Sequence, residues 1–95
     1  MTRLPPELLQ ELKQDYLNGL PSVISEIKAA LVSQDWEAIE KHFHRLAGSG
    51  QTYGLPEITV VGRKVEDYLQ KNSNPSHEFL EKALSELEMT LKRAS

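Results

Sequence analysis

The chain of 95 residues lacks cysteine and any long apolar run. The missing cysteine excludes disulfides, thiolate zinc sites and thiol redox chemistry, and it is typical of reducing compartments. We therefore expect a cytoplasmic protein. No stretch of about 18 apolar residues is present, and the N-terminal sequence MTRLPPELLQELKQ carries charges where a signal peptide needs an apolar segment. We expect neither export nor contact with a membrane.

Basic side chains are few and scattered. Lys and Arg number 11 against 14 Asp and Glu, which gives a net charge of −3. Because no basic cluster alternates with aromatic residues, the sequence offers no electrostatic footprint for nucleic acid, and we expect no such partner. The length suits one domain with one core, so we predict a single domain over residues 1–95.

Apolar residues recur at intervals of three and four in four segments, and none shows the period of two of a half-buried strand. This pattern predicts an all-α fold. The first segment starts at Pro5 and Pro6 and runs to about Gln34. Gly19 and Pro21 should break or kink it, so we interpret it as one long bent helix. Its apolar stripe comprises Leu8, Leu9, Leu12, Tyr16, Leu20, Val23, Ile24, Ile27 and Leu31.

Capping residues and prolines delimit the other three helices. Asp35 can cap the second helix, and Gly54 is expected to end it. Pro56 should start the third helix, which ends in the polar turn KNSNPS, where Ser76 or Asn74 caps the fourth. The short connections predict antiparallel neighbours, and therefore an up-and-down bundle of four helices.

A helical wheel separates the histidines of the second helix. Its apolar stripe, with Ile39 at zero, places His44 at about 140°, facing solvent, and His42 at about 300°, at the edge of the core. Gly48 lies one turn beyond His44, so its missing side chain should leave room for the backbone of another protein. Gly50 points inward, where it would allow a neighbouring helix to approach closely. Alternatively, AGSG ends a short helix and His44 is an ordinary surface histidine.

The histidines favour a carrier over an enzyme. Residues at i and i+2 do not share a helix face, and no cysteine or H-E-x-x-H motif completes a metal site, so none is expected. A small solid bundle leaves little concavity for a catalytic triad, which argues against an autonomous enzyme. An unperturbed imidazole is mostly neutral at pH 7, so an exposed one can attack an activated substrate.

The stretch HFHRLAGSGQTYGL resembles the signature of histidine-containing phosphotransfer (Hpt) domains, H-x-L-K-G-x-[SAG]-x-x-x-G. The residues in register are His44, Leu46, Gly48, Ser49, Gly50 and Gly54. The preceding SQDWEAIEKHFHRL resembles the usual lead-in of the family. VGRKVE resembles the segment of the next helix that packs beside the phosphorylated histidine. The resemblance covers nearly the whole chain and implies that His44 is a phosphoacceptor.

One position departs from the family pattern. Ala47 stands where relatives commonly carry a lysine whose ammonium supports the phosphoryl group. The substitute cation could be Lys41, Arg45 or Lys64, or the partner could supply it. We rank Lys64 first, because His44 and Lys64 each lie ten residues from the corner at Gly54.

Glu66 lies where relatives often direct a glutamate or glutamine at the histidine. The resemblance implies that it holds the Nδ1–H of His44 and leaves Nε2 as the attacking atom. Alternatively, Glu66 is a solvated helix residue.

The resemblance also implies partners. Nε2 of His44 would take a phosphoryl group from an aspartate of a response-regulator receiver domain or from a histidine kinase, and pass it to another receiver. Mg²⁺ would come from the receiver, with no intrinsic cofactor. The docking patch would surround His44 with Glu37, Glu40, Ala47, Gly48 and Gln51.

Two alternatives accompany this interpretation. The missing lysine leaves open a bundle that binds a kinase or receiver without being phosphorylated. Met1 and Ser95 are compatible with a free-standing carrier, and equally with the phosphoacceptor domain of a chemotaxis-type kinase excised from a longer chain. Nothing in the sequence indicates a dimer, so we expect a monomer.

Overall fold

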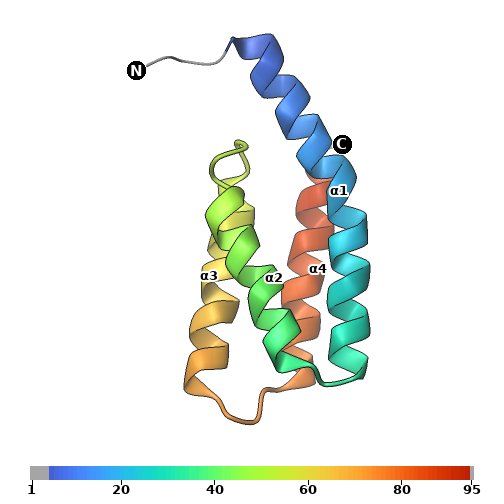
Figure 1. Ribbon diagram of the computed structural model, residues 1–95, viewed down its shortest axis with the longest axis vertical. Coiled ribbons are helices and arrows are strands. Elements are labelled where there is room, and N and C mark those ends of the chain that lie inside the picture. The colour runs from blue at the N-terminus through green and yellow to red at the C-terminus, as the bar shows by residue number, and fades with distance from the viewer. Residues whose placement is uncertain (1–4, 95) are drawn as a thin grey trace.

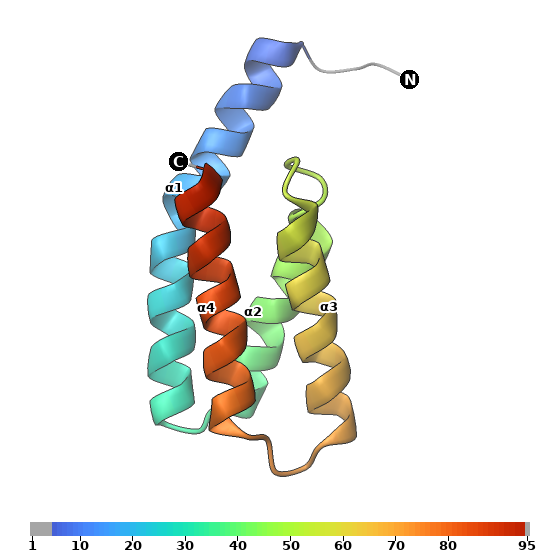
Figure 2. The same cartoon turned by 180° about the vertical axis from the view of Figure 1, so that it is seen from behind.

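A computed structural model describes residues 5–94, which form four helices and no strand (Figure 1). The helices are α1 (Pro6–Val32), α2 (Trp36–Ser49), α3 (Pro56–Lys71) and α4 (His77–Ala94). Consecutive helices pack antiparallel, and α4 closes the ring against α1 (Figures 1 and 2). The predicted all-α, up-and-down four-helix bundle is confirmed. The expected domain bounds include residues 1–4 and 95, which lie outside the described residues.

The first helix is one continuous element that bends. Pro6 occupies its first turn and Pro21 lies inside it, as predicted. Its N-terminal part leans away from the bundle and extends past the α2–α3 turn (Figures 1 and 2). Leu8 and Leu9 are therefore 39% and 44% exposed, although they belong to the apolar stripe of this helix. No neighbouring helix extends far enough to cover them.

The second helix starts as predicted and ends one turn early. The Asp35 carboxylate accepts a hydrogen bond from the backbone N–H of Ala38 at 3.2 Å. The helix ends at Ser49, and residues 50–54 form a turn closed by Gly54 at φ 80°. Ending the helix at Gly54 was therefore wrong. Tyr53 reaches the bundle from this turn, where its ring stacks on Tyr16 with centroids 4.9 Å apart.

Gly50 explains the early end of α2. A Cβ at Gly50 would lie 2.8 Å from the backbone N of Thr59 and 2.9 Å from the carbonyl O of Leu55. The incoming α3 therefore touches the backbone of Gly50 directly, which confirms the predicted close approach. The backbone N–H of Leu55 donates to the carbonyl of Gly50 at 2.8 Å, so the chain reverses there.

The later helices start at the predicted residues. Pro56 occupies the first turn of α3, and the Ser76 hydroxyl accepts the backbone N–H of Phe79 at 3.4 Å at the start of α4. All four helices contribute to the core. Its largest fully buried side chains are Phe43, Leu20, Ile27, Ile39, Ile58, Leu80, Leu87 and Val65.

Glycine also brings α2 and α3 together in mid-helix. A Cβ at Gly62 would lie 2.6 Å from the backbone N of Ala47 and 2.7 Å from the carbonyl O of Phe43. These two helices share the most extensive contact in the bundle. The crossing at Gly62 therefore determines which side chains of α3 lie beside His44.

No helix within residues 5–94 is both long enough and apolar enough to cross a membrane.

Candidate functional site

His44 lies on the solvent face of α2, and its side chain is 75% exposed. Its neighbour Phe43 is fully buried, so the wheel separates the two faces as predicted. Nδ1 of His44 lies 2.7 Å from Oε2 of Glu66 on α3. An ionised carboxylate only accepts hydrogen bonds, so Nδ1–H donates and the proton resides on Nδ1. Nε2 makes no hydrogen bond with any described residue and keeps its lone pair free.

Glu66 is the more buried member of this pair. Its side chain is 20% exposed, and it comes from the helix that crosses α2 at Gly62. The imidazole is thus oriented by a carboxylate on a different helix. The contact that the family resemblance implied is present in the structure.

Gly48 is exposed and helical, one turn beyond His44. A Cβ built there would have no neighbouring atom within 4 Å. The predicted clearance beside the imidazole is therefore present, on ordered helix. The alternative that AGSG ends a short helix is confirmed for the helix end, because α2 stops at Ser49.

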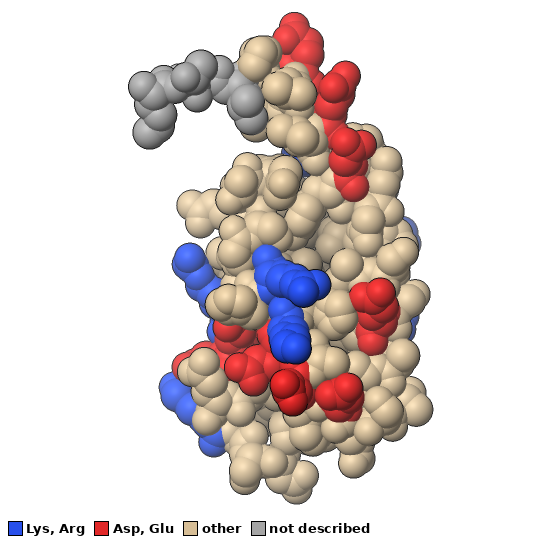
Figure 3. Space-filling view, viewed as in Figure 1, with Lys and Arg blue, Asp and Glu red and all other residues tan. Residues whose placement is uncertain are grey.

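A shallow hollow of about 460 Å³ lies against His44 on the same face. Figure 3 shows Lys and Arg side chains over α2 with Asp and Glu side chains immediately beside them. A partner would meet charges of both signs here. The residues that line the hollow are Glu37, Glu40, Lys41, His44 and Arg45.

Three of the other expected site residues lie elsewhere. Lys64 points to α4, where its Nζ lies 3.4 Å from Oε1 of Glu86, so the structure does not bring it to His44. Ala47 is 8% exposed and lies under the crossing with α3, so it offers a partner little surface. Gln51 is exposed in the turn after α2, where its backbone N–H donates to Oγ1 of Thr59 at 2.7 Å.

A hydrogen bond that the sequence did not predict ties α1 to the glycine segment. The hydroxyls of Tyr16 and Ser49 lie 2.8 Å apart. Ser49 Oγ donates to the carbonyl of Arg45 at 2.7 Å, so Tyr16 is the donor to Ser49. Burial raises the pKa of Tyr16 above 10.0, and nearby Tyr53 adds to this while Ser49 opposes it.

The other two histidines occupy structural positions. His42 is 18% exposed, and its Nε2 lies 3.4 Å from Oε2 of Glu26 on α1, in agreement with the prediction of a partly buried residue. His77 is exposed at the start of α4, with its ring edge against Trp36. Within residues 5–94, no three His, Cys, Asp or Glu side chains come close enough to hold a metal ion.

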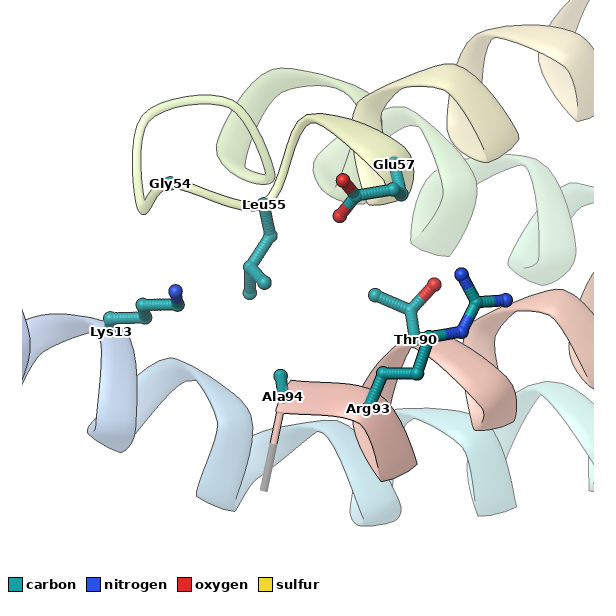
Figure 4. Close-up of a pocket in the computed structure, with 7 residues that line it drawn as sticks. All are labelled: Lys13, Gly54, Leu55, Glu57, Thr90, Arg93 and Ala94. Atoms are coloured by element: carbon teal, nitrogen blue, oxygen red, sulfur yellow. The ribbon is translucent and has the colours of Figure 1, made fainter.

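A separate hollow of about 250 Å³ lies at the end of the bundle under α1 (Figure 4). Lys13, Arg93 and Glu57 line it, so its charges are mixed. No buried side-chain N or O atom within residues 5–94 lacks a partner, here or elsewhere. This hollow therefore shows no polar group set aside for a ligand.

Comparison with known families identifies the chain. The family model of the Hpt domain matches residues 11–95. The chain belongs to the Hpt domain family. Hpt domains are phosphotransfer modules of two-component systems and work with receiver domains and kinases. Comparisons with curated proteins and with solved structures find no significant match.

The Hpt match gives the geometry its context. It begins at Glu11, so it covers the whole bundle and leaves out the first turns of the projecting part of α1. His44, whose Nδ1 is held by Glu66 on the neighbouring helix, lies in the middle of the matched region.

Proposed function

We propose that this Hpt domain is a phosphoryl carrier whose acceptor atom is Nε2 of His44. It accepts the group from a receiver aspartate or a histidine kinase and passes it to another receiver aspartate. The observation that carries the proposal is the 2.7 Å contact of Nδ1 with Glu66, together with an imidazole that is 75% exposed. This arrangement leaves one nitrogen of the ring free and accessible.

The transfer step follows from this tautomer. The Nε2 lone pair attacks the phosphorus of an aspartyl phosphate, the P–N bond forms, and the P–O bond breaks with its electron pair leaving on the aspartate. The Nδ1 proton stays on the ring, which becomes positively charged. Glu66 stabilises that charge because its carboxylate already accepts the Nδ1–H bond. The return step runs the same sequence in reverse.

The docking surface consists of the hollow around His44 and the bare helix at Gly48. Glu37 and Glu40 would meet basic groups of the partner, while Lys41 and Arg45 would meet acidic ones. Such complementarity speeds encounter more than it raises affinity, which suits a carrier that must release its partner. A transient interface of this kind can stay below about 1,200 Å² in total.

The projecting part of α1 extends this surface. Tyr16 links α1 to Ser49, the residue next to Gly48. Leu8 and Leu9, further along α1, are exposed apolar residues. A receiver seated over Gly48 would therefore also meet an apolar strip on α1.

The chemical machinery is divided between the two proteins. Mg²⁺ and the acidic pocket that activates the aspartyl phosphate belong to the receiver, and the Hpt domain needs no cofactor of its own. It acts as a carrier rather than as an autonomous enzyme. Lys41 and Arg45, which share the hollow with His44, are cations that could replace the family lysine missing at Ala47. We propose a cytoplasmic monomer.

A labelling experiment tests the proposal. The full chain is incubated with phosphorylated receivers or active kinases and assayed for acid-labile, base-stable phosphate. We expect label in the wild type, His42→Gln and His77→Gln, and none in His44→Gln. Label that persists in His44→Gln would overturn the assignment.

Ala47 supports one rival function, a bundle that binds receivers or kinases without accepting phosphate. This rival predicts stable binding of a receiver by the wild type and no label on any histidine. His44→Gln would then bind as well as the wild type does.

A further inference from the structure

Arg63 is a cation of α3 that the family signature does not single out. It is exposed and makes no hydrogen bond or ion pair with any other described residue. Its neighbour Lys64, by contrast, is paired with Glu86 on α4. Consecutive residues of a helix lie about 100° apart, so the side chain of Arg63 points in a different direction from that of Lys64.

The position of Arg63 relative to His44 follows from the helix crossing. With about 100° per residue, Arg63 lies about 60° from Glu66, on the side away from Gly62. Gly62 faces α2, and Glu66 reaches His44 from a direction slightly further around the axis of α3. Arg63 lies further around in the same sense, on the solvent side of the contact between Glu66 and His44. Lys64 lies about 160° from Glu66 on this wheel, in agreement with its contact to α4.

The level along the helices also matches. Gly62 meets α2 between Phe43 and Ala47. Gly62 is therefore level with about Arg45, and because α2 and α3 run antiparallel, one residue forward on α3 corresponds to one residue back on α2. Arg63 and His44 thus lie at nearly the same height across the crossing. An arginine side chain spans the groove between two helices packed this closely.

We infer that Arg63, in addition to the two cations of the hollow, supports the phosphoryl group on His44. This inference rests on the proposed function of His44 and adds a residue to it. Glu66 holds Nδ1 from α3, so the phosphoryl group on Nε2 projects from the opposite edge of the ring into solvent, and the long side chain of Arg63 must extend past Glu66 to meet it. The guanidinium of Arg63 donates there to phosphoryl oxygens and offsets charge that Glu66 would otherwise repel.

Charged groups on both helices surround this position. On α2 they are Glu37, Glu40, Lys41 and Arg45, which line the hollow with His44. On α3 they are Arg63 and the carboxylate of Glu66. Arg63 is the cation on the Glu66 side of the imidazole, where the family lysine at position 47 is replaced by the buried Ala47.

Phosphorus NMR of the phosphorylated chain tests this role without a partner protein. The full chain is phosphorylated with potassium phosphoramidate, and the phosphohistidine resonance is followed against pH in the wild type, Arg63→Gln and Lys64→Gln. A nearby cation favours the dianion, so its removal raises the pKa of the phosphoryl group. Loss of a full charge about 6 Å away in water corresponds to about half a pH unit.

The matched control makes the outcome decisive. We expect Arg63→Gln to raise that phosphoryl pKa, Arg63→Lys to restore most of the difference, and Lys64→Gln to leave it unchanged. No shift in Arg63→Gln, or an equal shift in Lys64→Gln, would overturn the role of Arg63 while leaving His44 as acceptor. A wild-type chain that forms no adduct on His44 would instead overturn the proposed function itself.

Discussion

Two glycines lie near His44, the buried Gly62 on α3 and the exposed Gly48 on α2. A single added methyl group should destabilise the bundle at Gly62 and stabilise it at Gly48. Gly62→Ala places a Cβ 2.6 Å from the backbone N of Ala47, whereas ordinary Cβ contacts start at 3.4 Å. Both obstructing groups are backbone atoms of α2, so no side-chain rotation relieves the overlap. The two helices must separate by about 0.8 Å.

The energetic consequence can be bounded. Overpacking of this kind costs about 1 to 3 kcal/mol. The higher helix propensity of alanine offsets up to about 1 kcal/mol of this cost. We therefore expect Gly62→Ala to lose up to about 2 kcal/mol of unfolding free energy, which lowers Tm by up to about 16 °C in a domain of this size.

Gly48→Ala is the matched control. It lies in the neighbouring helix, and its Cβ would have no atom within 4 Å. Only the propensity term remains, so its unfolding free energy should rise by up to about 1 kcal/mol. Thermal unfolding followed by circular dichroism compares the two variants with the wild type.

A second measurement links the crossing to the site. The Nδ1 to Oε2 distance of 2.7 Å spans the same two helices, so an opening of 0.8 Å takes it to the limit of a hydrogen bond. Nitrogen NMR of the His44 ring in Gly62→Ala should show a mixture of tautomers in place of one. If Gly62→Ala is as stable as Gly48→Ala and keeps a single tautomer, the reasoning about the crossing is refuted.

Three further predictions concern the site and its support. Glu66→Ala removes the hydrogen bond that orients the imidazole, so labelling of His44 by phosphoramidate should slow about 5- to 10-fold, for a loss of about 1 to 1.4 kcal/mol; an unchanged rate would contradict the positioning role. Gly48→Gln should raise Tm slightly through its better helix propensity and keep wild-type chemical labelling, while transfer from a phosphorylated receiver falls more than about 10-fold, which is a loss above about 1.4 kcal/mol; unimpaired transfer would refute the clearance argument. Because the folded-state pKa of Tyr16 is raised, its neutral hydroxyl contributes stability that is present below pH 10.0 and lost as the pH rises through the folded value. The stability difference between wild type and Tyr16→Phe in urea unfolding should therefore shrink above pH 10.0, and a constant difference would contradict burial as the cause of the shift.

Local sequence patterns predicted most of the fold because each helix carries its own boundary signal. Asp35, Pro56 and Ser76 act at helix starts where the sequence placed them. The end of α2 was missed for a physical reason. Tyr53 continues the apolar spacing, yet it reaches Tyr16 from a turn, so periodicity alone does not distinguish the turn from one more helical turn.

The site was predictable to the extent that it lies on one helix. A wheel places His44 outward, and Gly48 follows from its spacing. The rank of Lys64 was drawn from its level relative to the corner at Gly54, which says nothing about its direction around α3. Gly62 carried the missing information, since a glycine on the apolar arc of a helix indicates where a neighbour approaches. Once that contact is known, the wheel places Arg63 about 60° and Lys64 about 160° from Glu66.

The orientation of α2 has a consequence for the proposed function. Phe43 is fully buried while the adjacent His44 faces outward, so the chemistry and the packing occupy opposite sides of one helix. Phosphorylation of the His44 imidazole would therefore leave the packing around Phe43 unchanged. The bundle would then keep the same shape with and without the phosphoryl group, so only a protein that binds at the surface around His44 would detect the difference.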